Sequence, residues 1–206
     1  MLGNDVVDLR DPETCAVPRH PRFDRRVFSA EERRRIARSG APERLRWILW
    51  AAKEAAYKVA RKLDPRTVFS PSRFVVRVDE TLRGEVGLPG GASIPVLIRE
   101  DSECVHAIAC DSPDFEQALL IGIGALPAAQ PAEESRLARE LVARELAREL
   151  GRPLSELAIE KCGRIPFLRL AGADAQLDLT LSHHGRFAGF ACEAPQSVRL
   201  PKEPSP

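Results

Sequence analysis

The longest regular pattern in the chain runs from Leu45 to Leu63 and reads LRWILWAAKEAAYKVARKL. Its apolar residues return in steps of four and three, which places them on one face of an α-helix. Pro42 suits the first turn of this helix, and Asp64-Pro65 ends it because proline disfavours a helical residue before it. The stripe that we expect to be buried consists of Leu45, Leu49, Ala52, Ala56, Val59 and Leu63.

A shorter helix is predicted just before this one. Ser29 is a good N-cap for a helix that starts at Ala30, and Glu32 completes a capping box. We expect this helix to end near Gly40. Ahead of it, residues 2–9 read as a strand, and residues 11–26, rich in proline and arginine, read as a loop.

Beyond Asp64 the period of the apolar residues changes to two, which is typical of β-strands. The cluster Pro89-Gly90-Gly91 predicts a turn between two of them. The strands predicted in this region are Phe74–Val78, Ile94–Ile98 and Val105–Cys110.

The last third of the chain repeats this mixture of helix and strand. The segment from Pro127 to Glu134 is polar and contains proline, so it is the best linker candidate. Apolar residues from Leu137 to Leu150 predict a second amphipathic helix, which Gly151 closes. Two strands follow near residues 177–182 and 187–192, and residues 195–206 predict a disordered tail.

Two of the predicted strands resemble each other. Val105–Cys110 reads VHAIAC and Phe187–Cys192 reads FAGFAC, although small apolar strands also look alike by chance. The echo indicates two related halves, residues 1–125 and 133–194. The predicted fold class is therefore α+β, with two similar halves that form a pseudo-dimer, each a small antiparallel sheet packed on a long helix.

Composition argues against several classes of protein. The 206 residues are 44% hydrophobic and 30% charged, and a net charge of +1 gives no field for nucleic acid or an anionic membrane. No run approaches the ~18 apolar residues of a membrane helix, so we expect no membrane span, and we expect no signal peptide at the start. The five cysteines form no C-x-x-C pair, so we expect free thiols in a reducing cytoplasm.

One candidate site joins the start of the chain to the long helix. Asp5 is flanked by Val6 and Val7, and a carboxylate withdrawn from water favours a cation nearby. Glu54 and Lys58 are four residues apart, which also suits a simple surface ion pair. Two carboxylates from separate elements, with a lysine beside one, equally fit an oxygen site for Mg²⁺ and phosphate.

A second candidate site contains Ser182 and His183 at the end of a predicted strand, followed by Gly185. Adjacent strand residues point to opposite faces, which argues against a nucleophile and base pair. A polar turn and a phosphate-binding corner remain as alternatives. Arg136 opens the second long helix, where an arginine and a helix N-terminus can hold phosphate, but the mixed charges of that helix also fit a solvated face.

Several of these segments resemble one known family. The nine residues from Trp50 to Lys58 resemble the W-x-x-K-E-x-x-x-K signature of 4'-phosphopantetheinyl transferases, and Gly3-Asn4-Asp5 resembles the G-x-D strand that precedes it. The segment from Arg26 to Glu32 resembles the family's R-x-F-(S/T)-x-x-E, and the segment from Ser182 to Gly185 resembles S-H-x-G. The metal-binding part comes first here, the reverse of the surfactin-type enzymes.

The resemblance implies a role for each matched residue. It places Mg²⁺ between Asp5 and Glu54, with Lys58 on the pyrophosphate, Lys53 as a weaker candidate and Glu32 as a support of the metal site. Glu54, or a water on the metal, would take the proton. Val7 replaces the acidic third ligand of the surfactin-type enzymes. The residues implied around the 3'-phosphate of coenzyme A are Ser182, His183, Arg136 and Arg164.

Arg164 comes with a departure from the pattern. It replaces the lysine of a G-K-P turn, and Ile165 is inserted before Pro166. The resemblance as a whole implies transfer of 4'-phosphopantetheine from coenzyme A to a serine of an apo acyl or peptidyl carrier protein, as in fatty acid or polyketide biosynthesis. Two halves in one chain make a monomer sufficient. The rival hypotheses are a noncatalytic coenzyme A or carrier-protein binding module and, against the near-zero charge, an RNA- or DNA-binding protein.

Overall fold

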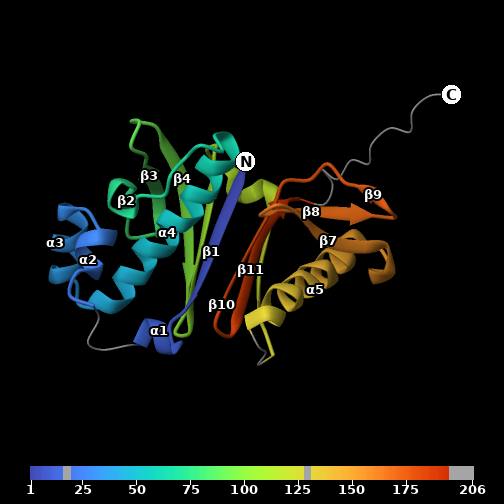
Figure 1. Ribbon diagram of the computed structural model, residues 1–206, viewed down its shortest axis with the longest axis horizontal. Helices are drawn as coiled ribbons and strands as arrows, with labels where there is room; N and C mark the ends of the chain where they lie inside the picture. The colour runs from blue at the N-terminus through green and yellow to red at the C-terminus, as the bar shows by residue number, and fades with distance from the viewer. Residues whose placement is uncertain (16–19, 128–130, 195–206) are drawn as a thin grey trace.

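Figure 1 shows the computed structural model of the chain, which describes residues 1–15, 20–127 and 131–194. The protein is an α+β fold of two halves, and in each half a long helix packs against antiparallel strands. Strands β1 (Leu2–Asp8) and β10 (Leu179–His184) meet between the halves. Within the described ranges, no helix is long and apolar enough to span a membrane.

The first half contains a five-stranded antiparallel sheet in the order β1-β5-β4-β3-β2, with helix α4 (Pro42–Leu63) packed on it. The shorter helices are α1 (Pro12–Cys15), α2 (Phe23–Val27), α3 (Ala30–Arg38) and the 3₁₀ helix η1 (Pro71–Arg73). The other strands are β2 (Val75–Val78), β3 (Arg83–Gly87), β4 (Ser93–Glu100) and β5 (Cys104–Cys110).

The second half contains two three-stranded sheets, β10-β11-β6 and β7-β8-β9, with helix α5 (Pro131–Leu150) packed on them. Short 3₁₀ helices η2 (Phe115–Ala118) and η3 (Leu154–Glu156) precede β6 and β7. The strands are β6 (Leu119–Ala125), β7 (Leu157–Cys162), β8 (Ile165–Leu170), β9 (Ala173–Asp174) and β11 (Phe187–Glu193).

Helix α4 confirms the buried stripe over most of its length. Leu49, Ala52, Ala56 and Val59 are fully buried in a core shared with β2 to β5, while Leu63, the last helical residue, is 54% exposed. Alanine has the highest helix propensity and the smallest side chain that a helix can use. The alanines of α4 therefore favour the helix and also let it approach the sheet closely.

The predicted capping box of α3 is confirmed. The amide of Glu32 donates to Ser29 Oγ at 3.2 Å, and the amide of Ser29 donates to Glu32 Oε2 at 2.7 Å. The helix ends at Arg38, two residues before the predicted Gly40. Glu32 is buried and serves the fold, as its further contacts below show.

Other parts of the sequence prediction were wrong or incomplete. The segment expected to be a loop, 11–26, contains α1 and the start of α2, and the expected linker already belongs to α5 from Pro131 onward. Strands β3 and β6 to β9 were not predicted. Strand β3 has only Val86 buried and two glycines, so it carries no clear period of two. The expected tail, residues 195–206, lies outside the described residues.

The two halves repeat one strand pair, which sharpens the predicted echo. Leu9 donates its amide hydrogen to the Glu103 carbonyl at 2.7 Å, and Leu126 donates to the Arg186 carbonyl at 2.7 Å. These bonds align β1 with β6 and β5 with β11. Val105 therefore corresponds to Ala188, whereas the sequence comparison matches it with Phe187, one residue earlier. Because β6 pairs with β11, residues 119–125 belong to the second half and the division at 125 was placed too late.

Candidate active site

Strand β1 presents alternate side chains to two sides, and Gly3 brings helix α4 close to it. A Cβ atom at Gly3 would lie 2.1 Å from the Ala55 carbonyl oxygen, so only glycine allows this approach. Two residues on, Asp5 points to the same side. Lys58 reaches over from α4 and donates to the Asn4 carbonyl at 2.5 Å and to Asp5 Oδ1 at 3.2 Å.

Asp5 and Glu54 form a pair of carboxylates in a poorly solvated place. Burial and the neighbouring Asp5 charge raise the pKa of Glu54 to about 7, and Lys58 offsets this only in part. Burial also raises the pKa of Asp5, which Lys58, His184 and His183 oppose. Two carboxylates this close, with one lysine between them, leave a local excess of negative charge that a cation would neutralise.

Glu54 is the free member of this pair. Lys58 bonds to Asp5 and not to Glu54, so the simple surface ion pair does not form. Among the residues that the structure describes, the Glu54 carboxylate has no hydrogen bond and no ion pair. An aromatic wall of Trp50, Tyr57 and Phe69 lies on the same side of α4, with the Tyr57 and Phe69 rings stacked at 4.6 Å.

His183 stands on the second half of the site, on β10. Its Nδ1 lies 3.4 Å from Glu134 Oε2. Burial lowers the pKa of His183, Glu134 opposes this, and the positive charges of Lys161 and Lys58 lower the pKa further. The charge of Lys58 therefore acts on both Asp5 and His183, although these two residues belong to different halves.

Two cations beside His183 were missed by the sequence analysis. Lys161 Nζ and Arg139 Nη1 both donate to Ser135 Oγ, each at 2.9 Å. Burial and the charge of Arg139 lower the pKa of Lys161. Two like charges that share one neutral acceptor favour an added anion. Lys161 follows Leu157 and Ile159 in steps of two, so a lysine on the same face as these residues could have been read from the sequence if β7 had been predicted.

Both arginines expected at the phosphate lie on the surface. Arg136 pairs with Glu140 at 2.6 Å and is 53% exposed, in agreement with the alternative of a solvated helix face. It also lines a cavity of about 350 Å³ between α5 and β7, together with Arg139 and Arg144. Arg164 is exposed in the turn after Gly163, and in the described part of the chain it makes no ion pair or hydrogen bond. The inserted Ile165 belongs to β8, so it lengthens this hairpin.

Lys53 and Glu32 do not reach the site, which corrects the expectation for both. The Lys53 ammonium is fully buried and donates to Glu32 Oε2 at 2.7 Å, to the Pro71 carbonyl at 2.9 Å and to the Phe74 carbonyl at 2.6 Å. Its three hydrogens are therefore used within the first half. Glu32 completes this network by accepting from the Val76 amide at 2.9 Å.

Ser182 is placed differently from His183, as their positions on a strand require. Its side chain is buried between the halves, and its Oγ accepts a hydrogen bond from Asn4 Nδ2 at 2.9 Å. Ser182 therefore faces the interior, which corrects its expected contact with coenzyme A. Only His183 faces the cluster of cations.

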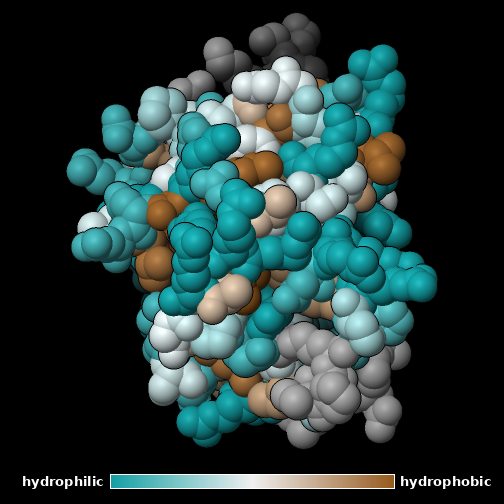
Figure 2. Space-filling model, turned by 90° about the vertical axis from the view of Figure 1, so that its left-hand side faces the viewer, coloured by the Kyte–Doolittle hydropathy of each residue, from teal (hydrophilic) through white to brown (hydrophobic). Residues whose placement is uncertain are grey.

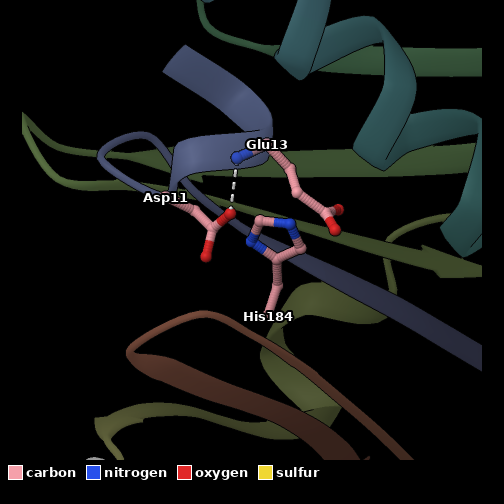
Figure 3. Close-up of side chains that lie close together, drawn as sticks. All are labelled: Asp11, Glu13 and His184. Atoms are coloured by element: carbon pink, nitrogen blue, oxygen red, sulfur yellow. Dashed lines mark hydrogen bonds between the residues drawn. The ribbon is translucent and has the colours of Figure 1, made fainter. Parts of the chain in front are cut away.

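His184 approaches two carboxylates, Asp11 and Glu13, in an arrangement that invites a metal assignment (Figure 3). The amide of Asp8 donates to His184 Nδ1 at 3.1 Å, so a neutral ring carries its proton on Nε2. Neither ring nitrogen then has a lone pair for a cation. Asp11 Oδ1 accepts from the Glu13 amide at 2.8 Å, which is an ordinary helix-start contact.

A comparison with known families follows this geometry. A family model described as the 4'-phosphopantetheinyl transferase superfamily matches residues 1–109, more than half of the chain. The chain therefore belongs to the 4'-phosphopantetheinyl transferase superfamily, and the resemblance stated from the motifs is confirmed. Members of this superfamily transfer phosphopantetheine from coenzyme A to carrier proteins. A search of the curated proteins finds no match.

Proposed function

We propose that this protein transfers 4'-phosphopantetheine from coenzyme A to a serine of an acyl or peptidyl carrier protein, with Mg²⁺ as cofactor and 3',5'-ADP as the other product. The observation that carries the proposal is the convergence of Asp5, Glu54 and Lys58 from β1 and α4, beside His183 from the other half. The proposal places the reaction in the cytoplasm, where coenzyme A is the co-substrate.

The residues present fit a hard divalent cation. Asp5 and Glu54 offer carboxylate oxygens, and the Glu54 carboxylate makes no hydrogen bond within the described residues. Its raised pKa marks an environment in which the negative charge lacks compensation. Mg²⁺ is commonly held by one or two carboxylates together with substrate phosphates. When bound, Mg²⁺ would supply the positive charge that the pyrophosphate needs during transfer.

The chain's own residues account for the remaining charge and for the proton. The carrier serine oxygen forms a bond to the β-phosphorus, and the bond from that phosphorus to the 3',5'-ADP oxygen breaks. Lys58 lies beside Asp5 and can donate to the phosphate oxygens as their charge shifts. Glu54 accepts the proton of the serine hydroxyl, since its carboxylate has no hydrogen-bond partner among the described residues.

The 3'-phosphate is best assigned to the second half. Lys161 and Arg139 already converge on Ser135 Oγ, and His183 lies within reach of the Lys161 charge. We therefore assign this phosphate to Lys161, Arg139 and His183, in place of Arg136 and Arg164. The neighbouring cavity of about 350 Å³, which has Leu157 and Ile159 in its lining, suits the adenosine part.

The carrier protein is assigned to the face formed by α2 and α3. Figure 2 shows this side of the molecule as mostly hydrophilic, with separate hydrophobic patches. The exposed arginines of this face would complement an acidic surface on the carrier protein. The exposed arginines of these two helices and the residue before them are Arg22, Arg25, Arg26, Arg34 and Arg38.

The test is incubation of the protein with coenzyme A, Mg²⁺ and an apo carrier protein, followed by mass spectrometry of the carrier. We expect the carrier to gain the mass of one phosphopantetheine group. The control variant Glu54→Gln should keep the fold and give no gain. A carrier that binds but gains no mass would instead support the rival hypothesis of a noncatalytic binding module.

A further inference from the structure

Strands β1 and β10 are the outer strands of their sheets, and they meet through side chains. In β1 the amides of alternate residues bond to β5, and the remaining ones point toward β10. Three of these outward amides are accepted by side chains spaced in steps of two and four along the neighbouring strand. The bonds run from Leu2, Asn4 and Asp8 to Asp178 Oδ2, Thr180 Oγ1 and His184 Nδ1, at 2.5, 3.1 and 3.1 Å.

We call these three bonds, with the Asn4 side chain at their centre, the side-chain ladder. The same sequence separation, 176 residues, joins every pair, so β1 and β10 run parallel at one fixed register. A shift by one residue would move one strand by about 3.3 Å along the other and turn alternate side chains to the opposite side. The ladder therefore sets how the two halves are aligned.

Asn4 satisfies every polar atom of its side chain across the two halves. Thr180 Oγ1 donates to Asn4 Oδ1 at 2.9 Å, and Asn4 Nδ2 donates to Ser182 Oγ at 2.9 Å and to His106 Nε2 at 3.1 Å. Burial lowers the pKa of His106 to about 3, so the ring stays neutral and can accept. A buried polar network that is fully satisfied favours one arrangement over all others.

The ladder lies directly next to both ends of the candidate site. Asn4 precedes Asp5, the metal end, and Ser182 precedes His183, the phosphate end. Any slip between β1 and β10 would change the separation of Asp5 and His183. The ribose joins the pyrophosphate and the 3'-phosphate of coenzyme A by a few bonds and so limits their separation, and both ends can bind it together only at a suitable register.

The equivalent place in the other half has no such ladder. Strand β5 pairs with β4, and β11 pairs with β10, so the same alignment also matches β4 with β10. In this alignment the acceptors Asp178, Thr180 and His184 correspond to Pro95, Leu97 and Asp101. Proline and leucine have no side-chain acceptor. Asp101 Oδ1 is already used by the amides of Glu103 and Cys104. The strand pairing of this fold therefore does not itself require a ladder, which occurs beside the candidate site.

We propose that Asn4 and Thr180 are positioning residues for the transfer reaction. They hold the Asp5 and His183 ends of coenzyme A at the separation that the reaction needs. The inference rests on the proposed function, because it assigns these residues a role in the same reaction. Neither residue touches the substrate, and each acts through its neighbour on the strand.

The test is Thr180→Val, which keeps the shape of the side chain and removes the central acceptor and donor. The readout is kcat/KM for coenzyme A and for dephospho-coenzyme A, which lacks the 3'-phosphate. We expect the ratio of the two to fall by about tenfold, because a misplacement of one ångström can cost still more. Ser182→Ala removes only one hydrogen bond of Asn4 and should lower the ratio less. This second variant keeps the test possible if Thr180→Val fails to fold.

The matched control is Thr67→Val, which removes a hydroxyl bonded to the Ala60 carbonyl at 3.3 Å, away from β10. It should leave the ratio unchanged. An equal loss for both substrates in Thr180→Val, or no loss, would overturn the positioning role.

Amide hydrogen exchange separates this inference from the proposed function. In Thr180→Val the amide of Asn4 should exchange faster, while the amide of Asp5, on the β5 side, should keep its rate. An unchanged Asn4 rate would refute the ladder regardless of activity. A wild-type protein that transfers nothing would refute the proposed function and with it the positioning role, whereas the exchange rates would still report on the ladder alone.

Discussion

Strands β1 and β6 occupy equivalent places in the two halves, but only β1 carries a carboxylate toward its helix. Asp5 pairs with Ala107, and the equivalent residue Gly122 pairs with Phe190. A Cβ atom at Gly122 would lie 2.3 Å from Phe190 Cε1, so the ring fills the space that a side chain would need. A small partner leaves room for a charged site in one half, and a large partner closes it in the other.

The same comparison extends to the clefts beside these strands. A cavity of about 130 Å³ next to β6 is lined by Glu100 and Gly122, among others. In the alignment of the halves, Glu100 takes the place of His183 and Gly122 the place of Asp5. The cavity beside β6 therefore lies at the place equivalent to the proposed site, and it lacks the carboxylate that Asp5 would offer to a metal.

The largest effect is expected when β1 is made to resemble β6. Asp5→Gly removes the acid that pairs with Glu54, so transfer should fall by about a hundredfold to a thousandfold, the usual loss when a group that stabilises developing charge is removed. Initial rates with saturating apo carrier would measure this. The control is Glu100→Gln in the cavity beside β6, which should keep its activity. Normal turnover by Asp5→Gly would remove Asp5 from the metal site.

The next prediction concerns pH and the raised pKa of Glu54. Its ordinary value is 4.5 and its value in the fold is about 7, so the folded protein binds this proton more tightly than the unfolded chain. The stabilisation is present below the ordinary pKa and is lost as the pH rises through about 7. Without metal, this group alone should lower the free energy of unfolding by roughly 3 kcal/mol over this interval.

Urea unfolding of the wild type and of Glu54→Gln at pH 5 and pH 8, without divalent ions, would measure this contribution as the difference between the two proteins. The comparison is needed because His106, whose pKa burial lowers to about 3, adds stability as the pH rises over the same interval. The wild type should lose stability relative to Glu54→Gln as the pH rises, because the amide of the variant does not titrate. Added Mg²⁺ should raise the stability of the wild type at pH 8, since a ligand that binds only the folded state stabilises it. Equal changes in stability between pH 5 and pH 8 in the two proteins would show that Glu54 is better solvated than its position indicates.

The sequence predicted the parts of this comparison that depend on local pattern. The stripe of α4, the capping box at Ser29 and the strand around Asp5 follow from spacing and residue type, and the motif at Glu54 identified a carboxylate whose pKa burial and the charge of Asp5 raise. Strands β6 to β9 were missed because glycines and charged residues interrupt their period. The fate of Lys53 could not be read from the sequence, because its partners Glu32 and Phe74 are brought to it by tertiary packing, whereas the pairing of Arg136 with Glu140 four residues later is local.

A smaller effect is expected from the glycines that let each helix approach its strand. Gly3→Ala forces the backbone of α4 away from β1, since the new Cβ would meet the Ala55 carbonyl oxygen at 2.1 Å. We expect a loss of about 1–3 kcal/mol in unfolding free energy, as for other overpacked cores. Transfer should fall too, because Glu54 and Lys58 move with the helix.

Gly124→Ala in β6 is the matched control for Gly3→Ala. Its Cβ would meet Leu141 Cδ1 at 2.5 Å, the end of a flexible side chain that can turn aside. The variant should lose less stability and keep its activity. If both variants lost the same stability and the same activity, the close approach of α4 to β1 would have no special part in the site.

The smallest effect is expected at the phosphate end, where His183 and Glu100 hold equivalent places. His183→Ala should lower kcat/KM for coenzyme A by about tenfold, the scale of one charge-assisted hydrogen bond to phosphate. It should hardly change kcat/KM for dephospho-coenzyme A, which has no 3'-phosphate. Glu100→Ala, in the cavity beside β6, should change neither value. Equal losses for both substrates in His183→Ala would show that His183 supports the fold or the metal end instead, and the 3'-phosphate would then belong to Lys161 and Arg139 alone.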